Sequence, residues 1–157
     1  MKSLLVLFSY HHKNTEKIAK VFAKVLDAKI KTPHQIKPQE LTKYDLIGFG
    51  SGIYGAKHHK SLLELADKLP QVTNNMAFIF STSAIMGKSK VAEDHWPLRE
   101  KLESRGYTIA GEFSCKGFNT NSFLKFFGGM NRGRPNTEDL NNAKEFAQNM
   151  KQDACGS

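Results

Sequence analysis

The hydrophobic positions of the chain alternate between short continuous runs and longer runs with helical spacing. Continuous apolar runs are typical of strands that are buried on both faces of a sheet, and they occur at 3–9, 44–51, 75–83 and 108–115. A shorter edge-strand candidate lies at 29–31. Helical spacing of apolar residues occurs at 14–28, 60–70, 95–107 and 137–151. Strands and helices are therefore predicted to alternate along the whole chain.

The ends of the predicted helices carry residues that favour those boundaries. Pro70 ends the second helix, Gly106 ends the third, and Thr137 is the predicted N-cap of the last.

This alternation predicts an α/β fold with a doubly wound five-stranded parallel sheet, order 2-1-3-4-5, and helices on both faces. We expect one domain over residues 1–152 and a disordered tail at 153–157. Ligands of such sheets bind at the carboxyl ends of the strands, where the strand order reverses. Here that position lies between the strands predicted at 3–9 and 44–51.

The composition of the chain limits the classes of protein to which it can belong. The chain has 157 residues, which is enough for one domain with a full core, and its formal net charge of +8 favours acidic partners. The basic residues form no long run, so we expect neither a basic tail nor a nucleic-acid partner. Two cysteines do not make a disulfide framework, and no apolar run approaches the roughly 18 residues that cross a bilayer. We therefore expect a cytoplasmic protein.

The turn between the first strand and the first helix is rich in side-chain hydrogen-bond donors. Its candidate ligand-binding residues are Ser9, His11, His12, Lys13, Asn14 and Thr15. A loop in front of a helix N-terminus makes an anion cradle, because the first backbone N–H groups and the helix dipole both favour negative charge. An ordinary polar capping turn is the alternative. The donor-rich composition at the predicted switch point favours a phosphate site.

The next two turns face the same predicted crevice. Tyr54 lies between Gly52 and Gly55, where it either stacks on a flat ring or simply covers the end of a strand. The stretch 50–55 also fits the pattern G-x-G-x-x-G, but no acidic residue ends the next predicted strand, so we treat that match as coincidence.

Three sequence features together resemble the flavodoxin family. "SYHHKNTEKIAK" resembles the flavodoxin phosphate loop, which usually ends Gly-Asn-Thr, and Asn14, Thr15 and Glu16 match it. Tyr54 and Gly55 occupy the place of the aromatic residue and glycine of the next flavin loop. The segment "GRPNTEDLNNAKEFAQNM" looks like the terminal helix of many flavodoxin-like proteins. The resemblance covers nearly the whole chain and is to the short-chain type.

The resemblance implies noncovalent binding of FMN and electron transfer between a reductase and an acceptor. The loop 9–15 would hold the phosphate, Tyr54 would cover one face of the ring, and Gly55 would be the hinge of a peptide near the ring nitrogen N5. Positive charge implies an acidic redox partner protein. The cofactor-binding residues implied in this way are Ser9, His11, His12, Lys13, Asn14, Thr15, Gly52, Ile53, Tyr54, Gly55, Thr82, Ser83, Ala84 and Ile85.

The chain departs from the family pattern in three respects. Lys13 stands where the family often has Gly, and because Lys resists positive φ we expect an altered loop geometry. No second aromatic residue follows the strand predicted at 75–83. Most flavodoxins are acidic, whereas this chain is basic.

Two other functions remain open. "SGIYGAKHHKSL" also resembles the corresponding stretch of flavodoxin-like protoporphyrinogen oxidases, which are basic as well, although this chain lacks their long additional loop. A flavin-free α/β module that binds nucleic acid or a phosphorylated ligand is the alternative from another class. We expect an electron carrier rather than a stand-alone enzyme, and we assign no catalytic residue.

Two further features, the histidine pairs and the segment 118–135, are candidate binding sites. The pairs His11–His12 and His58–His59 offer metal-ligating nitrogens, but consecutive side chains rarely converge on one ion, so we expect no metal site. The segment 118–135 is aromatic and basic. It is either a short packed helix or a docking surface for a protein, a quinone or a membrane.

Overall fold

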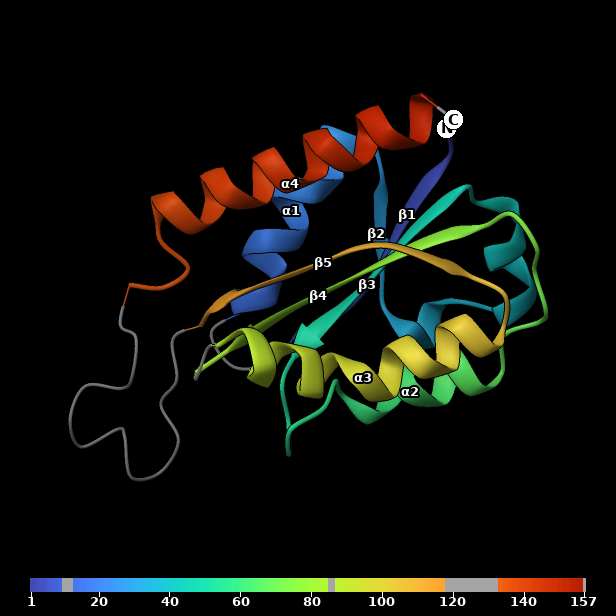
Figure 1. The fold of residues 1–157 in the computed structure, drawn as a ribbon, viewed down its shortest axis with the longest axis horizontal. Coiled ribbons are helices and arrows are strands. Elements are labelled where there is room, and N and C mark those ends of the chain that lie inside the picture. The colour runs from blue at the N-terminus through green and yellow to red at the C-terminus, as the bar shows by residue number, and fades with distance from the viewer. Residues whose placement is uncertain (10–12, 85–86, 118–132, 157) are drawn as a thin grey trace.

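The central sheet has five parallel strands in the order β2-β1-β3-β4-β5, which confirms the predicted fold class (Figure 1). The computed structural model describes residues 1–9, 13–84, 87–117 and 133–156. The strands are β1 (Ser3–Phe8), β2 (Lys29–Lys31), β3 (Leu46–Gly52), β4 (Met76–Ser83) and β5 (Thr108–Lys116). The α-helices are α1 (Asn14–Leu26), α2 (Lys60–Asp67), α3 (Lys88–Ser104) and α4 (Thr137–Cys155). Two short 3₁₀ helices, Pro33–Gln35 and Pro38–Lys43, precede β3.

Helices cover both faces of the sheet, with α1 and α4 on one side and α2 and α3 on the other (Figure 1). Each face has its own apolar core. Phe22 and Phe80 belong to the core under α1 and α4, and Phe49 and Leu102 belong to the core under α2 and α3. The strands are buried on both faces, which is why their sequences read as continuous apolar runs.

The buried face under α2 and α3 becomes polar at the carboxyl end of the sheet. Phe8, Ser51, Ser81 and Ser114 are register partners across β1, β3, β4 and β5. Ser51 and Ser81 are almost fully buried. A row of serines therefore lies beneath the loops where a ligand is expected.

Helix α3 begins at Lys88, seven residues before the start predicted at residue 95. The prediction put Pro97 in the first turn, whereas the structure has Pro97 inside the helix. The first turns of α3 show no apolar periodicity because polar contacts hold them. Lys90 pairs with the buried Asp94, and the next residue, His95, is buried among polar groups.

The predicted N-cap of α4, Thr137, lies one position too late. Asn136, not Thr137, caps the helix: its side chain accepts a hydrogen bond from the Asp139 N–H at 3.0 Å, and Asp139 accepts one from the Asn136 N–H at 2.8 Å. At its other end α4 continues to Cys155, so it includes the first residues of the segment predicted as a tail. Within the described part of the chain, every helix is too short or too polar to cross a membrane.

Candidate functional site

Three loops meet at the carboxyl ends of β1, β3 and β4, where the strand order reverses. The first runs from Ser9 to α1, the second from Gly52 to α2, and the third from Ser83 to α3. His11, His12 and Ile85 are predicted site residues that lie outside the described part of the chain, as does most of the segment 118–135.

The first loop has the backbone geometry that a glycine would provide, although its residue is a lysine. Lys13 adopts φ 51° and ψ 37°, the left-handed conformation, immediately before α1. Lys13 therefore adopts the positive φ that a lysine was expected to resist. The conformation costs roughly 1–2 kcal/mol for a residue with a Cβ atom, and it places a cation at the helix N-terminus.

Side chains of the first loop connect it to the rest of the site. Thr15 is buried, and its hydroxyl lies 2.8 Å from that of Thr82 in β4. The side chain of Asn14 packs so closely on Gly117 that a Cβ atom at residue 117 would lie 2.7 Å from Asn14 Nδ2. The Ser9 hydroxyl is buried and has no hydrogen-bond partner among the described residues.

The second loop is a tight hairpin. Ile53 and His58 form an antiparallel bridge, and Tyr54 and Lys57 exchange backbone hydrogen bonds of 2.7 and 3.3 Å. The two central residues both have positive φ, 57° at Gly55 and 62° at Ala56. Positive φ at both central positions is the signature of a type I′ turn. A Cβ atom at Gly55 would meet nothing within 4 Å, so space beside the turn is open.

Tyr54 belongs to an aromatic cluster with two residues that sequence analysis did not assign to the site. The rings of Phe8 and His59 are stacked, with centroids 3.5 Å apart and planes 6° apart. Tyr54 approaches both edge-on, at 6.3 Å from Phe8 and 5.3 Å from His59. Its hydroxyl lies back over Gly52, 3.3 Å from where a Cβ atom would be. The signal in the sequence is Phe8, an aromatic residue next to the end of the strand predicted at 3–9.

The two histidines of the pair His58–His59 point to different partners. His58 Nε2 lies 3.0 Å from the Phe80 carbonyl oxygen, and His59 Nδ1 lies 2.8 Å from the Ser61 hydroxyl. Burial lowers the pKa of His58 to about 3 and also lowers the pKa of His59, which has Lys60 nearby. Among the described residues, no three His, Cys, Asp or Glu side chains gather as metal ligands would.

The end of β4, where the third loop begins, is joined to the first two loops and to the residue that follows β5. The Ile53 N–H donates to the Thr82 carbonyl at 3.2 Å, and the Gly117 N–H donates to the Ser83 carbonyl at 3.0 Å. Thr82 itself contacts Thr15. The structure therefore brings together the described residues of all three predicted loops around the end of β4.

Behind the site lies a hydrogen-bonded chain that the sequence did not reveal; it is buried at Ser81 and His95 and reaches the surface at Arg99 and Glu112. His95 Nε2 lies 2.7 Å from the Ser81 hydroxyl, and His95 Nδ1 lies 3.1 Å from a Glu112 carboxylate oxygen. Ser81 also contacts the Ser114 hydroxyl at 2.9 Å, and Arg99 binds both Glu112 oxygens at 2.7 and 3.1 Å. We call these five residues the buried chain.

Ser81, His95 and Glu112 are hydrogen-bonded in the order of a serine-hydrolase triad, but the serine is not accessible to a substrate. The distances from serine to histidine and from histidine to carboxylate match those of serine hydrolases. Ser81, however, is only 1% exposed, so an acyl substrate does not reach its hydroxyl. Burial alone would raise the pKa of Glu112, but the hydrogen bonds from His95 and Arg99 outweigh it and lower that pKa to about 2. Glu112 is therefore a carboxylate that orients His95.

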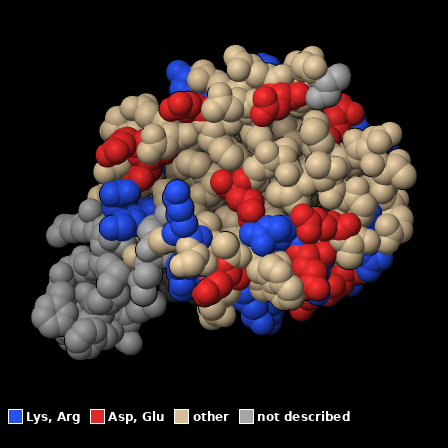
Figure 2. All heavy atoms as spheres, viewed as in Figure 1, with Lys and Arg blue, Asp and Glu red and all other residues tan. Residues whose placement is uncertain are grey.

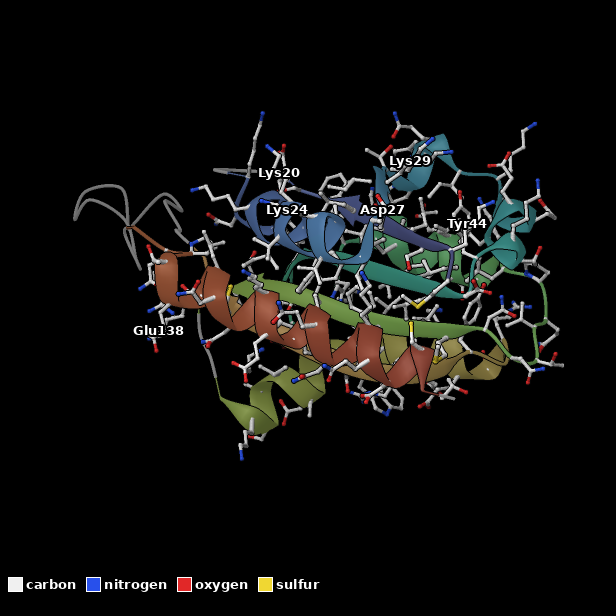
Figure 3. The ribbon with its side chains drawn as sticks, turned by 90° about the horizontal axis from the view of Figure 1, so that it is seen from above. Lys20, Lys24, Asp27, Lys29, Tyr44 and Glu138 are labelled. Carbon is white, nitrogen blue, oxygen red and sulfur yellow. The ribbon has the colours of Figure 1, made fainter. Side chains whose placement is uncertain are left out.

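The described surface carries charges of both signs. Acidic and basic side chains are interspersed on the face that carries α3, β5 and α4 (Figure 2). Lys20 and Lys24 on α1 and Lys29 on β2 are exposed, and they lie on the side of the molecule seen in Figure 3. Lys20 is paired with Glu16 at 3.2 Å.

Comparison with known proteins identifies the family. The model of the flavodoxin domain matches residues 5–129. An uncharacterized protein of Methanocaldococcus jannaschii is 49% identical over 150 residues, which cover 96% of this chain and 98% of that protein. Among solved structures, oxidised Flavodoxin 2 from Bacillus cereus superposes with a TM-score of 0.74 at 17% identity, covering 98% of this chain and 99% of that one. The Fusobacterium nucleatum flavodoxin bound to flavin mononucleotide superposes with a TM-score of 0.65 at 11% identity, covering 98% and 99%. With four-fifths of its length matched by the family model, the chain belongs to the flavodoxin domain family.

Proposed function

We propose that this chain binds FMN without a covalent bond and carries electrons between a reductase and an acceptor. The observation that supports it most directly is the Ser9 hydroxyl, which is buried without a described partner at the mouth of the first loop. A buried hydroxyl without a partner costs roughly 1–3 kcal/mol. A phosphate oxygen at this position would remove that cost.

The first loop is the proposed phosphate site. Backbone N–H groups at the start of α1 face the loop, because the first N–H groups of a helix have no acceptor within it. The hydroxyls of Ser9 and Thr15 and the amide of Asn14 add donors, and Lys13 adds positive charge. We also assign His11 and His12 to this site from the sequence.

The second and third loops are the proposed ring site. Tyr54 is partly exposed, and the position of Gly55 faces open space, which leaves room beside the turn for a planar ring. Tyr54 is the proposed stacking residue. Backbone groups of 52–55 and 82–85 would meet the polar edges of the ring.

FMN, when bound, would supply the redox chemistry, and the chain would tune it electrostatically. Lys57 is exposed and ends the turn that begins at Tyr54, so its positive charge lies beside the proposed ring site. Positive charge there favours the more negative, reduced cofactor and raises its reduction potential.

The proposed redox partner is an acidic protein. The chain carries a net charge of +8, and α1 and β2 carry exposed lysines, among them Lys20, Lys24 and Lys29. Complementary charge accelerates association and makes it sensitive to salt. Electron transfer to an acidic partner should therefore slow as ionic strength rises.

Titration of the purified protein with FMN, followed by quenching of flavin fluorescence and by calorimetry, tests the cofactor. We expect stoichiometric binding and a yellow complex, and absence of FMN uptake would end this proposal. Turnover of protoporphyrinogen in the loaded protein distinguishes the oxidase alternative, because a carrier would show none beyond the rate of free FMN.

A further inference from the structure

The geometry of the ring-site turn depends on a residue that is itself buried. His58 is the last residue of the hairpin and pairs with Ile53 across its base. Its side chain does not face solvent, since the residue is 1% exposed. The ring points to β4 instead, where Nε2 lies 3.0 Å from the Phe80 carbonyl oxygen.

This contact fixes the tautomer of His58. A carbonyl oxygen only accepts hydrogen bonds, so Nε2 must carry the proton and donate it. Nδ1 is then a lone-pair acceptor, and it is buried without a partner among the described residues. The bond from Nε2 thus ties the His58 side chain to β4 in a fixed direction.

A second contact holds the His58 ring from α3. The ring of His95 lies 4.9 Å from it, centroid to centroid, at an angle of 54°. His95 is fully buried and is fixed at both nitrogens by the buried chain. The Glu112 carboxylate only accepts hydrogen bonds, so His95 Nδ1–H donates to it, while Nε2 contacts the Ser81 hydroxyl. Helix α3 and β4 therefore together form a rigid backing for the hairpin.

We propose that His58, backed by the buried chain, is a positioning residue that holds the Tyr54–Lys57 turn against the flavin ring site. This inference rests on the proposed FMN function. The turn has two residues with positive φ, and its base is joined to β4 by the His58 side chain and by the Ile53 N–H bond to Thr82, so its orientation depends on these anchors. A turn that is held in its binding orientation adds affinity because less freedom is lost on binding.

The test compares FMN with riboflavin, which lacks the phosphate. The variant His58→Phe keeps a ring but cannot donate to the Phe80 carbonyl oxygen. We expect its affinity for both flavins to fall by the same factor, about tenfold, and the midpoint potential of bound FMN to shift. His58→Gln keeps a donor near the Nε2 position and should stay within threefold of the wild type for both flavins.

A control variant separates positioning from general loosening of the fold. Ile47→Val removes one methylene from a buried side chain near the amino end of β3 and destabilises the fold about as much as one lost hydrogen bond. It should leave both affinities and the potential unchanged. If His58→Phe does not fold, Ser81→Ala takes its place: it removes the contact between His95 and β4, and we expect a fall of about threefold for both flavins.

The outcomes are distinguishable from failure of the proposed function. A wild type that binds neither flavin refutes FMN binding and this inference with it. A wild type that binds both, with His58→Phe or Ser81→Ala indistinguishable from it, overturns only the positioning role. Loss of FMN affinity with riboflavin affinity intact also overturns it, because the effect would then act through the phosphate loop.

Discussion

His58 should make the free energy of unfolding fall in mildly acidic solution. Burial lowers its pKa from 6.5 to about 3. The groups that face it are the imidazole of His95, the carboxylate of Glu112 and the backbone of Phe80 and Asp94. In the folded protein His58 stays neutral at pH 5, whereas in the unfolded chain it is mostly protonated.

The direction and size of the effect follow from proton linkage. Because the unfolded state binds the extra proton, the stabilisation is fully present above pH 6.5 and is lost as the pH falls toward about 3. Each pH unit below 6.5 changes the free energy of unfolding by about 1.4 kcal/mol. At pH 5 the contribution of His58 is therefore a loss on the order of 2 kcal/mol, a substantial part of the roughly 5–15 kcal/mol that stabilises a typical domain.

Urea unfolding at pH 7.5 and pH 5.0, without added flavin, measures this loss. The wild type should lose about 2 kcal/mol more than His58→Gln, because glutamine cannot titrate but still donates to the Phe80 carbonyl. Other groups that titrate in this range act in both proteins and cancel in the comparison. His34→Gln, at an exposed histidine in the helix Pro33–Gln35, should behave like the wild type.

Equal losses in the wild type and His58→Gln would refute the reasoning. That result would mean that His58 takes up a proton in the folded state at pH 5, and that its site is far better solvated than its exposure indicates. If the free energy of unfolding fell less in His34→Gln than in the wild type, exposed histidines would contribute to the pH dependence. The difference assigned to His58 would then be too large.

Three further predictions test other parts of the structure. Thr15→Val, which removes the hydroxyl that contacts Thr82 in β4, should weaken FMN binding about tenfold and leave riboflavin binding unchanged in calorimetry; equal losses would place its effect at the ring. Gly106→Ala should lower the free energy of unfolding in urea by more than about 3 kcal/mol, since φ is +93° and the new Cβ atom would lie 1.9 Å from the Val72 carbonyl oxygen. Gly133→Ala, at φ +82° with open space around it, should lower it by about 1 kcal/mol. Similar losses would show that the contact with Val72 relaxes freely. Lys57→Gln should lower the midpoint potential of bound FMN by about 20 mV or less in a redox titration, because solvent screens an exposed charge; an increase would contradict the assigned electrostatics.

The sheet could be predicted from the sequence because its strands are buried on both faces. β1, β3 and β4 lie within two residues of the predicted boundaries. Their order follows from right-handed crossovers and from the alternation with helices. The three loops of the candidate site were also predictable, since the carboxyl ends of neighbouring parallel strands converge.

The parts that were not predictable depend on contacts between distant polar residues. The start of α3 carries no apolar periodicity, because Asp94 and His95 are buried through polar partners. The buried chain joins α3, β4 and β5, and no local spacing signals such a connection. Lys13 has a conformation that its own propensity disfavours, so tertiary contacts such as that between Thr15 and Thr82 must override it.

The positive φ of Ala56 affects the balance between two forms of the Tyr54–Lys57 turn. Rotating the Gly55–Ala56 peptide plane would convert the type I′ turn into type II′, in which only the first central residue keeps a positive φ. Gly55 accepts both forms at no steric cost, whereas Ala56 would escape its left-handed conformation and shed roughly 1 kcal/mol. The methyl group of Ala56 thus biases the direction in which the Gly55 carbonyl oxygen points. A glycine there would remove the bias, and a β-branched residue would strengthen it.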